Sequence, residues 1–246
     1  MKKHQRLTPE SRPPSFAESH HASLAANDPS ADPFVVKVGL NMVQRSVKRL
    51  FDLLSVIVIL VLFFWAIIAV AIAVRLTTGS PVIYGHMRVG RDGREFNCYK
   101  FRSMVPNADK VLARLLATDA NARKEWNRDF KLKNDPRVTR VGQFIRKTSL
   151  DEFPQLWNVL MNDMSIVGPR PVVRKELDVY YSGAEDHYTS VKPGLTGPWQ
   201  VSGRNDMEYS ERVTLDMDYV ETWGLFRDLV IVLRTVGVMV GRKGAY

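Results

Sequence analysis

Residues 53–74 read LLSVIVILVLFFWAIIAVAIAV, and Ser55 is the only clearly polar residue among these 22. As a helix the segment would be about 33 Å long, at about 1.5 Å per residue, which is enough to cross the hydrocarbon core of a bilayer. A buried helix in a water-soluble domain is rarely so uniformly apolar. The segment therefore predicts a chain that is built around one membrane-embedded helix.

Basic residues flank this segment on both sides. They are Lys37, Arg45, Lys48 and Arg49 before it, and Arg75, Arg88, Arg91 and Arg94 after it. The positive-inside rule would keep both flanks in the cytoplasm, which a re-entrant hairpin satisfies and a straight span does not. The segment contains neither Pro nor Gly, so no break is written into it and a straight span stays open. The flanks favour re-entry.

Composition divides the chain into three parts. Residues 1–36 are rich in Ser, Pro, Ala, His and Asn and lack apolar periodicity, so they predict a disordered tail. Residues 37–76 form the membrane-embedded helical segment. Residues 77–246 show short strands and amphipathic helices and predict a compact cytoplasmic domain. The expected fold class is α+β and helix-rich, with a small sheet and with amphipathic helices at the membrane surface.

Within the third part, several elements can be placed from periodicity and turn residues. Short strands are expected at 82–84 and 95–101, around a turn at 90–93. Polar-faced helices are expected at 109–118 and 121–130, and a further helix after a cap at Asp206. Residues 229–240 are strongly apolar but too short to span a bilayer, so they predict a core helix or one at the membrane surface.

Charge and cysteine content limit the function classes. The formal net charge is +9, and the acids and bases of the first 36 residues cancel, so the surplus belongs to the rest of the chain. Such a surplus suits nucleic acid, anionic lipid or phosphorylated substrates, and the apolar segment favours the membrane. Cys98 is the only cysteine, which excludes an internal disulfide and a Cys-rich metal site.

Two adjacent carboxylates, Asp151 and Glu152, stand before an amphipathic run. Apolar residues recur there at helical spacing and predict a buried helix face from about Asp151 to Met161: Phe153, Leu156, Trp157, Leu160, Met161 and Met164. Pro154 fits only the first turn, which favours Asp151 as the cap, although Ser149 with Glu152 also fits a capping box. An ionised Asp beside a Glu at a helix start suits a carboxylate nucleophile or a divalent-metal site.

Basic residues surround the acid pair. They are Arg137, Arg140, Arg146 and Lys147 before it and Arg170 after it, with Pro169 and Pro171 on either side of that arginine. An acid at a helix start is usually only a cap. Acids together with several arginines indicate a phosphate-handling site, because a guanidinium group matches phosphate oxygens in a two-pronged geometry. The segment 135–137 fits either a plain turn or a phosphate contact through Arg137.

The order of these pieces resembles the bacterial sugar transferase family, the polyprenyl-phosphate hexose-1-phosphate transferases, and specifically its small members that start exopolysaccharide assembly. The resemblance runs from about Arg45 to the C-terminus. Its motifs are KRLFD at 48–52, KFRSM at 100–104, NDPRVT at 134–139, the stretch from Arg146 to Gln155, MSIVGPRP at 164–171 and KPGLTGPWQVSGR at 192–204. The family's membrane segment normally carries Ser-Pro near its midpoint, and Phe64-Trp65 stand there in this sequence.

This resemblance implies a phosphoglycosyl transferase that moves hexose-1-phosphate from UDP-galactose or UDP-glucose to undecaprenyl phosphate and releases UMP, the first committed step of exopolysaccharide synthesis. Asp151 would be the nucleophile that forms a phosphosugar-aspartyl intermediate, and Glu152 would bind Mg²⁺. Phosphates would be contacted by Lys100, Arg146, Pro169, Arg170 and Pro171, and the nucleotide sugar by Gln200, Arg204 and Asp216.

The same resemblance implies a location and partners. The catalytic domain is expected on the cytoplasmic face of the bacterial inner membrane, with a homodimer and downstream glycosyltransferases as partners and without nucleic acid. Two other functions compete with it. A nucleic-acid or anionic-lipid binding protein leaves the acid pair unexplained, and the intact acidic and basic residues argue against a non-catalytic scaffold of a polysaccharide assembly complex.

Overall fold

The computed structural model describes residues 39–129, 132–202, 207 and 209–241. The expected tail at 1–36 lies outside the described residues. The elements are α2 (Met42–Thr78), β1 (Ile83–Val89), η2 (Arg91–Gly93), β2 (Glu95–Phe101), α3 (Ala108–Thr118), α4 (Ala120–Asp129), α5 (Arg140–Lys147), η3 (Leu150–Glu152), α6 (Gln155–Leu160), β3 (Ser165–Val167), α7 (Arg174–Tyr180), α8 (Glu185–Thr189), β4 (Gly194–Thr196), α9 (Pro198–Ser202), α10 (Tyr209–Glu221) and α11 (Leu225–Gly241). This helix-rich α+β arrangement confirms the expected fold class.

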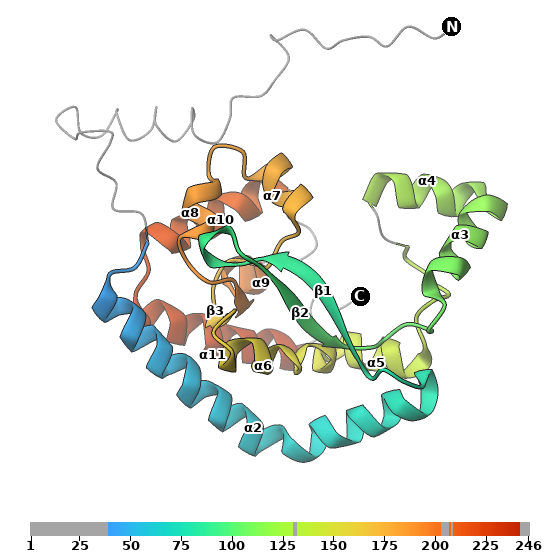
Figure 1. Ribbon diagram of the computed structural model, residues 1–246, viewed down its shortest axis with the longest axis horizontal. Coiled ribbons are helices and arrows are strands. Elements are labelled where there is room, and N and C mark those ends of the chain that lie inside the picture. Colours follow the sequence, from blue (N-terminus) through green and yellow to red (C-terminus); the bar gives the residue numbers. More distant parts are fainter. Residues whose placement is uncertain (1–38, 130–131, 203–206, 208, 242–246) are drawn as a thin grey trace, which may run out of the picture.

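The apolar segment belongs to the long helix α2. Its first turn is closed by a capping box in which Asn41 and Gln44 each accept the other's backbone N–H at 2.9 Å. Within the described part of the chain, α2 is the one helix long and apolar enough to cross a membrane. Many apolar side chains of α2 are exposed, and the exposed fraction of Trp65 is 78%. Figure 1 shows α2 bent near its middle, although it contains neither Pro nor Gly and stays helical throughout.

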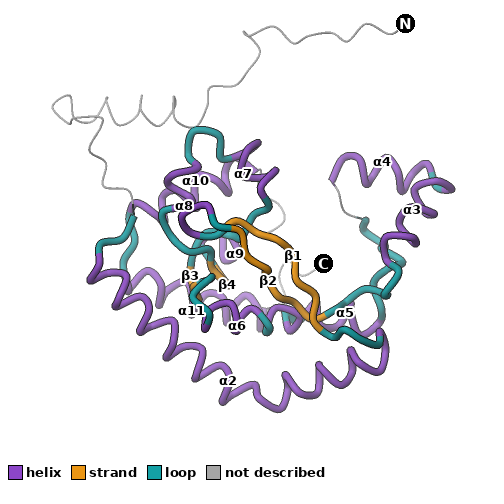
Figure 2. Tube along the Cα trace, in the orientation of Figure 1, coloured by secondary structure: helices purple, strands orange, loops and turns teal. Residues whose placement is uncertain are grey.

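The strands form two small sheets. β1 and β2 make an antiparallel hairpin with Ile83 opposite Phe101, so the first strand is longer than the expected 82–84. Asp92 and Gly93 adopt the left-handed φ values of 59° and 70° that close the tight turn between them. The short strands β3 and β4 pair in parallel through Ser165 and Gly194. Figure 2 shows both pairs lying between the helices.

The main core joins α2 to the rest of the protein. Val56 of α2 packs in one buried cluster with Leu156 and Val159 of α6, and Ile231 of α11 belongs to the same cluster. A second cluster, around Tyr181 and Tyr188, packs α7 and α8 against α10. In Figure 1, α3 and α4 stand apart from these layers as a separate arm.

Helices α5, α6 and α11 lie beside the arch of α2 (Figure 1). These helices and their ends carry exposed apolar side chains. These side chains are Phe144, Trp157, Met161, Phe226, Leu229, Leu233 and Val236, and we call them the apolar rim. The expectation that Trp157 and Met161 are buried is wrong, because each is 57% exposed. Leu156 and Val159 already fill the core side of α6, and one residue further turns the side chain by about 100°. Helix α11 has a core side, on which Ile231 is buried, and an exposed apolar side, on which Phe226 is 79% exposed.

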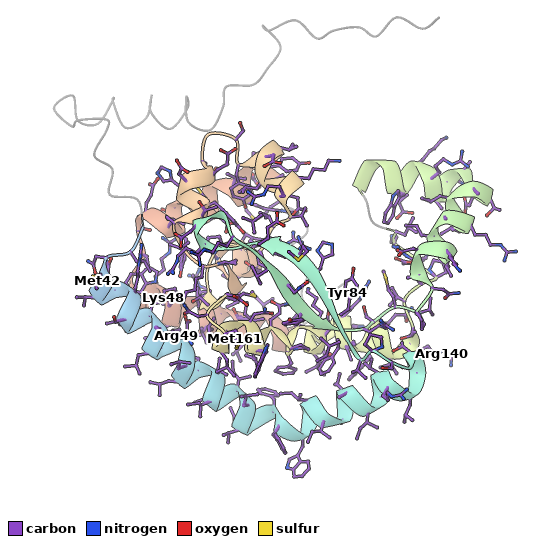
Figure 3. The ribbon with its side chains drawn as sticks, in the orientation of Figure 1. Met42, Lys48, Arg49, Tyr84, Arg140 and Met161 are labelled. Carbon is purple, nitrogen blue, oxygen red and sulfur yellow. The ribbon has the colours of Figure 1, made fainter. Side chains whose placement is uncertain are left out.

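Polar residues near the start of α2 hold it against the other elements. Lys48 Nζ lies 2.7 Å from Asp228 Oδ2 and donates to Tyr219 Oη at 3.0 Å. Arg49 donates to the carbonyl oxygens of Val159 and Leu160 at 2.6 and 2.9 Å, which satisfies the C-terminal end of α6. Figure 3 shows Lys48 and Arg49 on the side of α2 that faces the rest of the molecule.

We predict that Asp228→Ala lowers the free energy of unfolding by about 3 kcal/mol, because Lys48 would stay buried without its counter-ion. The neighbouring variant Arg227→Ala breaks a partly exposed pair with Asp218 and should cost less than about 1 kcal/mol. Thermal unfolding of the detergent-solubilised protein measures both. Equal losses in the two variants would contradict the importance of the buried pair.

Candidate active site

The acid pair lies in a turn of 3₁₀ helix rather than at the cap of an α-helix. Asp151 and Glu152 belong to η3, and α6 begins only at Gln155, after Pro154. Ser149 has a left-handed φ of 56° and its side chain makes no capping hydrogen bond. The expected cap at Asp151 and the alternative capping box are therefore wrong. The left-handed residue redirects the chain after α5, so that both carboxylates precede α6 instead of closing its first turn.

Helix α6 is fixed to β2 by an asparagine. Asn158 is fully buried, accepts the backbone N–H of Tyr99 at 3.0 Å and donates to the carbonyl oxygen of Asn97 at 2.8 Å. These two bonds hold α6, and with it the preceding acid pair, against the part of β2 that carries Lys100. The result is that a lysine on one element faces a carboxylate on another.

Lys100 and Glu152 form an ion pair with 2.5 Å between Nζ and Oε1. Burial acts against the charged ammonium, but Glu152 and Asp151 outweigh it and raise the pKa of Lys100. Glu152 Oε2 receives no hydrogen bond from a described residue. Both side chains are partly open to solvent, so a ligand can reach the pair.

Asp151 is the more buried of the two acids, with 9% of its surface exposed. Burial and the neighbouring charge of Glu152 raise its pKa to about 6, and Lys100 and Arg146 act in the opposite direction. The carboxylate is therefore mostly ionised at neutral pH, in a partly desolvated position between two cations. This is the environment that a carboxylate nucleophile requires.

Arg146, on helix α5, lies in electrostatic range of Asp151. Its Nε donates to Ser103 Oγ at 2.8 Å, and its two terminal nitrogens take no part in that bond. Helix α5 can approach Ser103 so closely because residue 142 is glycine: a Cβ there would lie 1.9 Å from the Ser103 carbonyl oxygen. Thr139 caps the helix by accepting the N–H of Gly142 at 2.9 Å.

The segment 135–137 is engaged within the protein. Arg137 binds Asp135 through two nitrogens, with Nη2 2.7 Å from Oδ2 and Nε 2.8 Å from Oδ1, and both side chains are about nine-tenths buried. The guanidinium also lies over the ring of Trp126, 5.1 Å from its centre. This geometry supports the turn interpretation of the sequence over a phosphate contact by Arg137.

The Pro169-Arg170-Pro171 element follows the end of β3, and two of its carbonyl oxygens accept hydrogen bonds. Gly194 N–H donates to the Pro169 carbonyl oxygen at 2.8 Å, and Tyr188 Oη donates to that of Arg170 at 2.7 Å. The close approach of these strands requires glycine, since a Cβ at Gly194 would lie 2.1 Å from the Gly168 nitrogen. The loop is therefore rigidly placed, and its arginine side chain is the part left to contact a ligand.

The other predicted substrate contacts have different surroundings. Gln200 lies half-buried on α9. Asp216 is completely buried on α10 and accepts a hydrogen bond from Tyr181 Oη at 2.9 Å. Burial raises the pKa of Asp216 to about 7, against the opposing effects of Tyr181 and Arg170. From this position Asp216 can act on a substrate only through its neighbours. Arg204 lies outside the described residues.

The predicted residues fall into two overlapping electrostatic groups. Lys100, Glu152 and Arg146 act on Asp151, and Lys100, Glu152 and Arg170 all act on the thiol of Cys98. Burial raises the pKa of that thiol to about 11, so Cys98 stays protonated and apolar in character. A carboxylate pair with Lys100 and Arg146 in electrostatic range can bind and polarise a phosphorylated substrate.

Two residues that support this site were not found from the sequence. Asn158 and Ser103 position the acid pair and Arg146, yet neither residue type stands out in its local pattern. Asn158 interrupts the apolar face of α6 and could have been noticed as a buried polar position. Across the described ranges, no group of three or more His, Cys, Asp or Glu side chains could hold a metal by itself.

A family model for bacterial sugar transferases matches residues 43–242, and the chain belongs to that family. It is 52% identical over 220 residues to the UDP-galactose-lipid carrier transferase of Erwinia amylovora and 52% identical over 221 residues to the undecaprenyl-phosphate galactose phosphotransferase of Salmonella typhimurium. Each match covers 88% of this chain and 46% of the relative, so the chain spans about half the length of these proteins. The exopolysaccharide production protein ExoY of Rhizobium meliloti is 47% identical over 199 residues, which cover 81% of this chain and 88% of that protein.

We predict a pH-dependent stability difference between the wild type and Asp216→Asn. Because the pKa of Asp216 rises from about 4 in the unfolded chain to about 7 in the folded protein, its protonated form stabilises the fold at low pH, and this contribution is lost as the pH rises to 7. The amide keeps an acceptor for Tyr181 and does not titrate. The melting temperature of the variant relative to wild type should therefore increase from pH 5 to pH 8. A constant difference would contradict the raised pKa.

Proposed function

We propose that this protein is a phosphoglycosyl transferase that moves hexose-1-phosphate from a UDP-hexose to undecaprenyl phosphate and releases UMP, as the first committed step of exopolysaccharide synthesis. The observation that carries this proposal is the buried carboxylate of Asp151 next to the Lys100–Glu152 ion pair, with Arg146 in electrostatic range of it. The names of two relatives include galactose and a lipid carrier or undecaprenyl phosphate, which supports UDP-galactose as the donor.

In the proposed reaction an Asp151 carboxylate oxygen attacks the phosphorus next to the sugar. A bond forms between this oxygen and the phosphorus, the bond to the bridging oxygen of the diphosphate breaks, and UMP leaves with that oxygen. A phosphate oxygen of the lipid then attacks the same phosphorus, and the aspartyl–phosphorus bond breaks to regenerate the carboxylate. Two steps at one carboxylate replace a direct encounter of two bulky anions.

The cations around Asp151 make this attack feasible. An anionic nucleophile and a diphosphate repel each other unless positive groups spread the developing charge. Lys100 and Arg146 act on the carboxylate itself, and Arg170 adds a positive charge from the Pro-Arg-Pro loop. We assign these three side chains to phosphoryl oxygens of the donor and acceptor.

Glu152 fits a role in binding Mg²⁺. Mg²⁺ needs few protein ligands when substrate phosphates and water complete its octahedron, and Glu152 Oε2 receives no hydrogen bond within the described part of the chain. When bound there, the ion would supply charge neutralisation to the diphosphate. Lys100 keeps the other oxygen of Glu152 in place and so orients the carboxylate.

We further infer that α2 is embedded in the cytoplasmic leaflet of the inner membrane as a re-entrant helix. Its bend, its exposed apolar surface and the basic residues on both flanks support this placement. The apolar rim of α5, α6 and α11 would then rest on the same bilayer and bring the acid pair to the level of a lipid phosphate. A homodimer and contacts with downstream glycosyltransferases stay predictions from the sequence.

We predict that Asp151→Asn abolishes UMP release from UDP-galactose and undecaprenyl phosphate, because an amide is a poor nucleophile. Detergent-purified wild type should turn over, and the variant should fall by at least about 10³-fold while it melts near the wild-type temperature. Asp178→Asn, an exposed change on α7, is the matched control and should stay active. Full activity of Asp151→Asn would contradict the nucleophile assignment.

Replacing Glu152 tests the proposed metal site separately. Glu152→Gln should need more Mg²⁺ for half-maximal rate, by about tenfold or more, because an amide is a weaker ligand for a hard cation. The exposed variant Glu185→Gln should follow the wild-type Mg²⁺ titration. An unchanged Mg²⁺ requirement in Glu152→Gln would place the ion elsewhere.

A further inference from the structure

Two arginines lie over the indole ring of Trp199, and one of them is Arg170 of the Pro-Arg-Pro loop. Trp199 is 9% exposed, and the guanidinium carbons of Arg170 and Arg212 lie 5.3 and 4.8 Å from the centre of its ring. Guanidinium groups at this distance from an indole are attracted by the ring's quadrupole. The ring is therefore already covered by cations, which leaves the edge of the indole, with its N–H, as the part that can meet a ligand.

Two donors at this place have no acceptor. Trp199 Nε1 and Arg212 Nε are both buried, and neither has a hydrogen-bond partner among the described residues. Arg212 is otherwise well held, because its Nη2 donates to the Met207 carbonyl oxygen at 3.0 Å and its guanidinium also lies over Tyr209. Buried N–H groups are almost always paired, so two neighbouring exceptions among the described residues make this a place where a ligand can supply the acceptor.

The chemistry of that acceptor follows from the charges. Within the described part of the chain, the Arg170 guanidinium forms no ion pair and donates no hydrogen bond. Arg212 likewise has no carboxylate partner among the described residues. Two arginines that form no ion pair with a described residue, around one indole, favour an anion beyond the charge of Asp216 that acts on Arg170, and the planar array of N–H groups matches phosphoryl oxygens.

We propose that Trp199 Nε1–H and Arg212 Nε–H bind phosphoryl oxygens of the nucleotide-sugar diphosphate, so that Arg212 is a fourth phosphate-binding cation beside Lys100, Arg146 and Arg170. This inference rests on the proposed function, because it assigns the donor end of the same site. Stacking on Arg212 is the role of the Trp199 ring, and donation from its edge is the role of its N–H. The ring of Tyr209, which also contacts the Arg212 guanidinium, keeps that group in place.

The sharpest variant is Trp199→Phe, because it removes the N–H and retains an aromatic ring for the two guanidinium groups. Arg212→Gln removes the charge and the Nε–H together. Trp157→Phe on the exposed side of α6 and Arg174→Gln in a partly exposed pair with Glu95 are the matched controls. Circular dichroism and thermal melting establish that each full-length variant is folded, and Trp199→Phe decides the question if Arg212→Gln does not fold.

Calorimetric titration of the detergent-solubilised protein with UDP measures binding without turnover. We expect UDP to bind about tenfold more weakly to Trp199→Phe and at least about tenfold more weakly to Arg212→Gln, with wild-type affinity in both controls. The KM for UDP-galactose should rise by similar factors, while the KM for undecaprenyl phosphate stays within about twofold of wild type.

The outcomes separate this subsite from the proposed function. Wild-type UDP affinity in both folded variants would overturn the subsite and leave the transferase activity standing. A raised KM for undecaprenyl phosphate with unchanged UDP affinity would also overturn it, because the phosphoryl group bound there would be that of the lipid. If the wild type binds UDP but turns over no UDP-hexose, and the variants bind UDP more weakly, the subsite stands and the proposed function fails.

Discussion

The buried polar contacts of one turn of α2 fix where the apolar helix meets the rest of the protein. Lys48 pairs with Asp228 on α11, Arg49 binds the last carbonyl groups of α6, and Asp52 Oδ1 accepts Ser165 Oγ at 2.7 Å and the N–H of Ile166 at 2.9 Å. Breaking such contacts would leave charges buried without partners, which costs far more than the loss of a surface ion pair. The three contacts therefore set one rigid position of α2 against α6, β3 and α11.

The site inherits this geometry. Helix α6 follows directly on the acid pair and is clamped to β2 by Asn158, while β3 leads into the Pro-Arg-Pro loop. The helix that follows the acid pair and the strand that leads into the Pro-Arg-Pro loop are thus both attached to the same turn of α2. Under the proposed membrane placement, a lipid phosphate at the bilayer surface would meet Asp151, the proposed nucleophile, and the nearby cations in a fixed arrangement.

Local patterns in the sequence were sufficient for the fold class, the apolar helix, the β1–β2 hairpin and the grouping of the acid pair with Arg146, whereas the place of Lys100 in the site was expected only from the family resemblance. They were insufficient where tertiary contacts decide. The left-handed Ser149 turns the chain between α5 and the acid pair, and no residue preference signals that conformation. Asn158 and Ser103 act across 59 and 43 positions of sequence, so their roles appear only when distant elements meet. The exposure of Trp157 fits the proposed placement of the apolar rim on a membrane, where the usual link between apolar character and burial is reversed.

The most direct test of the covalent mechanism is the amount of UMP released in a single mixing of the protein with UDP-galactose when undecaprenyl phosphate is absent. The mechanism predicts a burst that approaches one UMP per active protein molecule, together with a mass increase of one hexose phosphate on the peptide that contains Asp151. Release of UMP only after the lipid phosphate is added, with no labelled peptide, would contradict it and would indicate direct attack by the lipid.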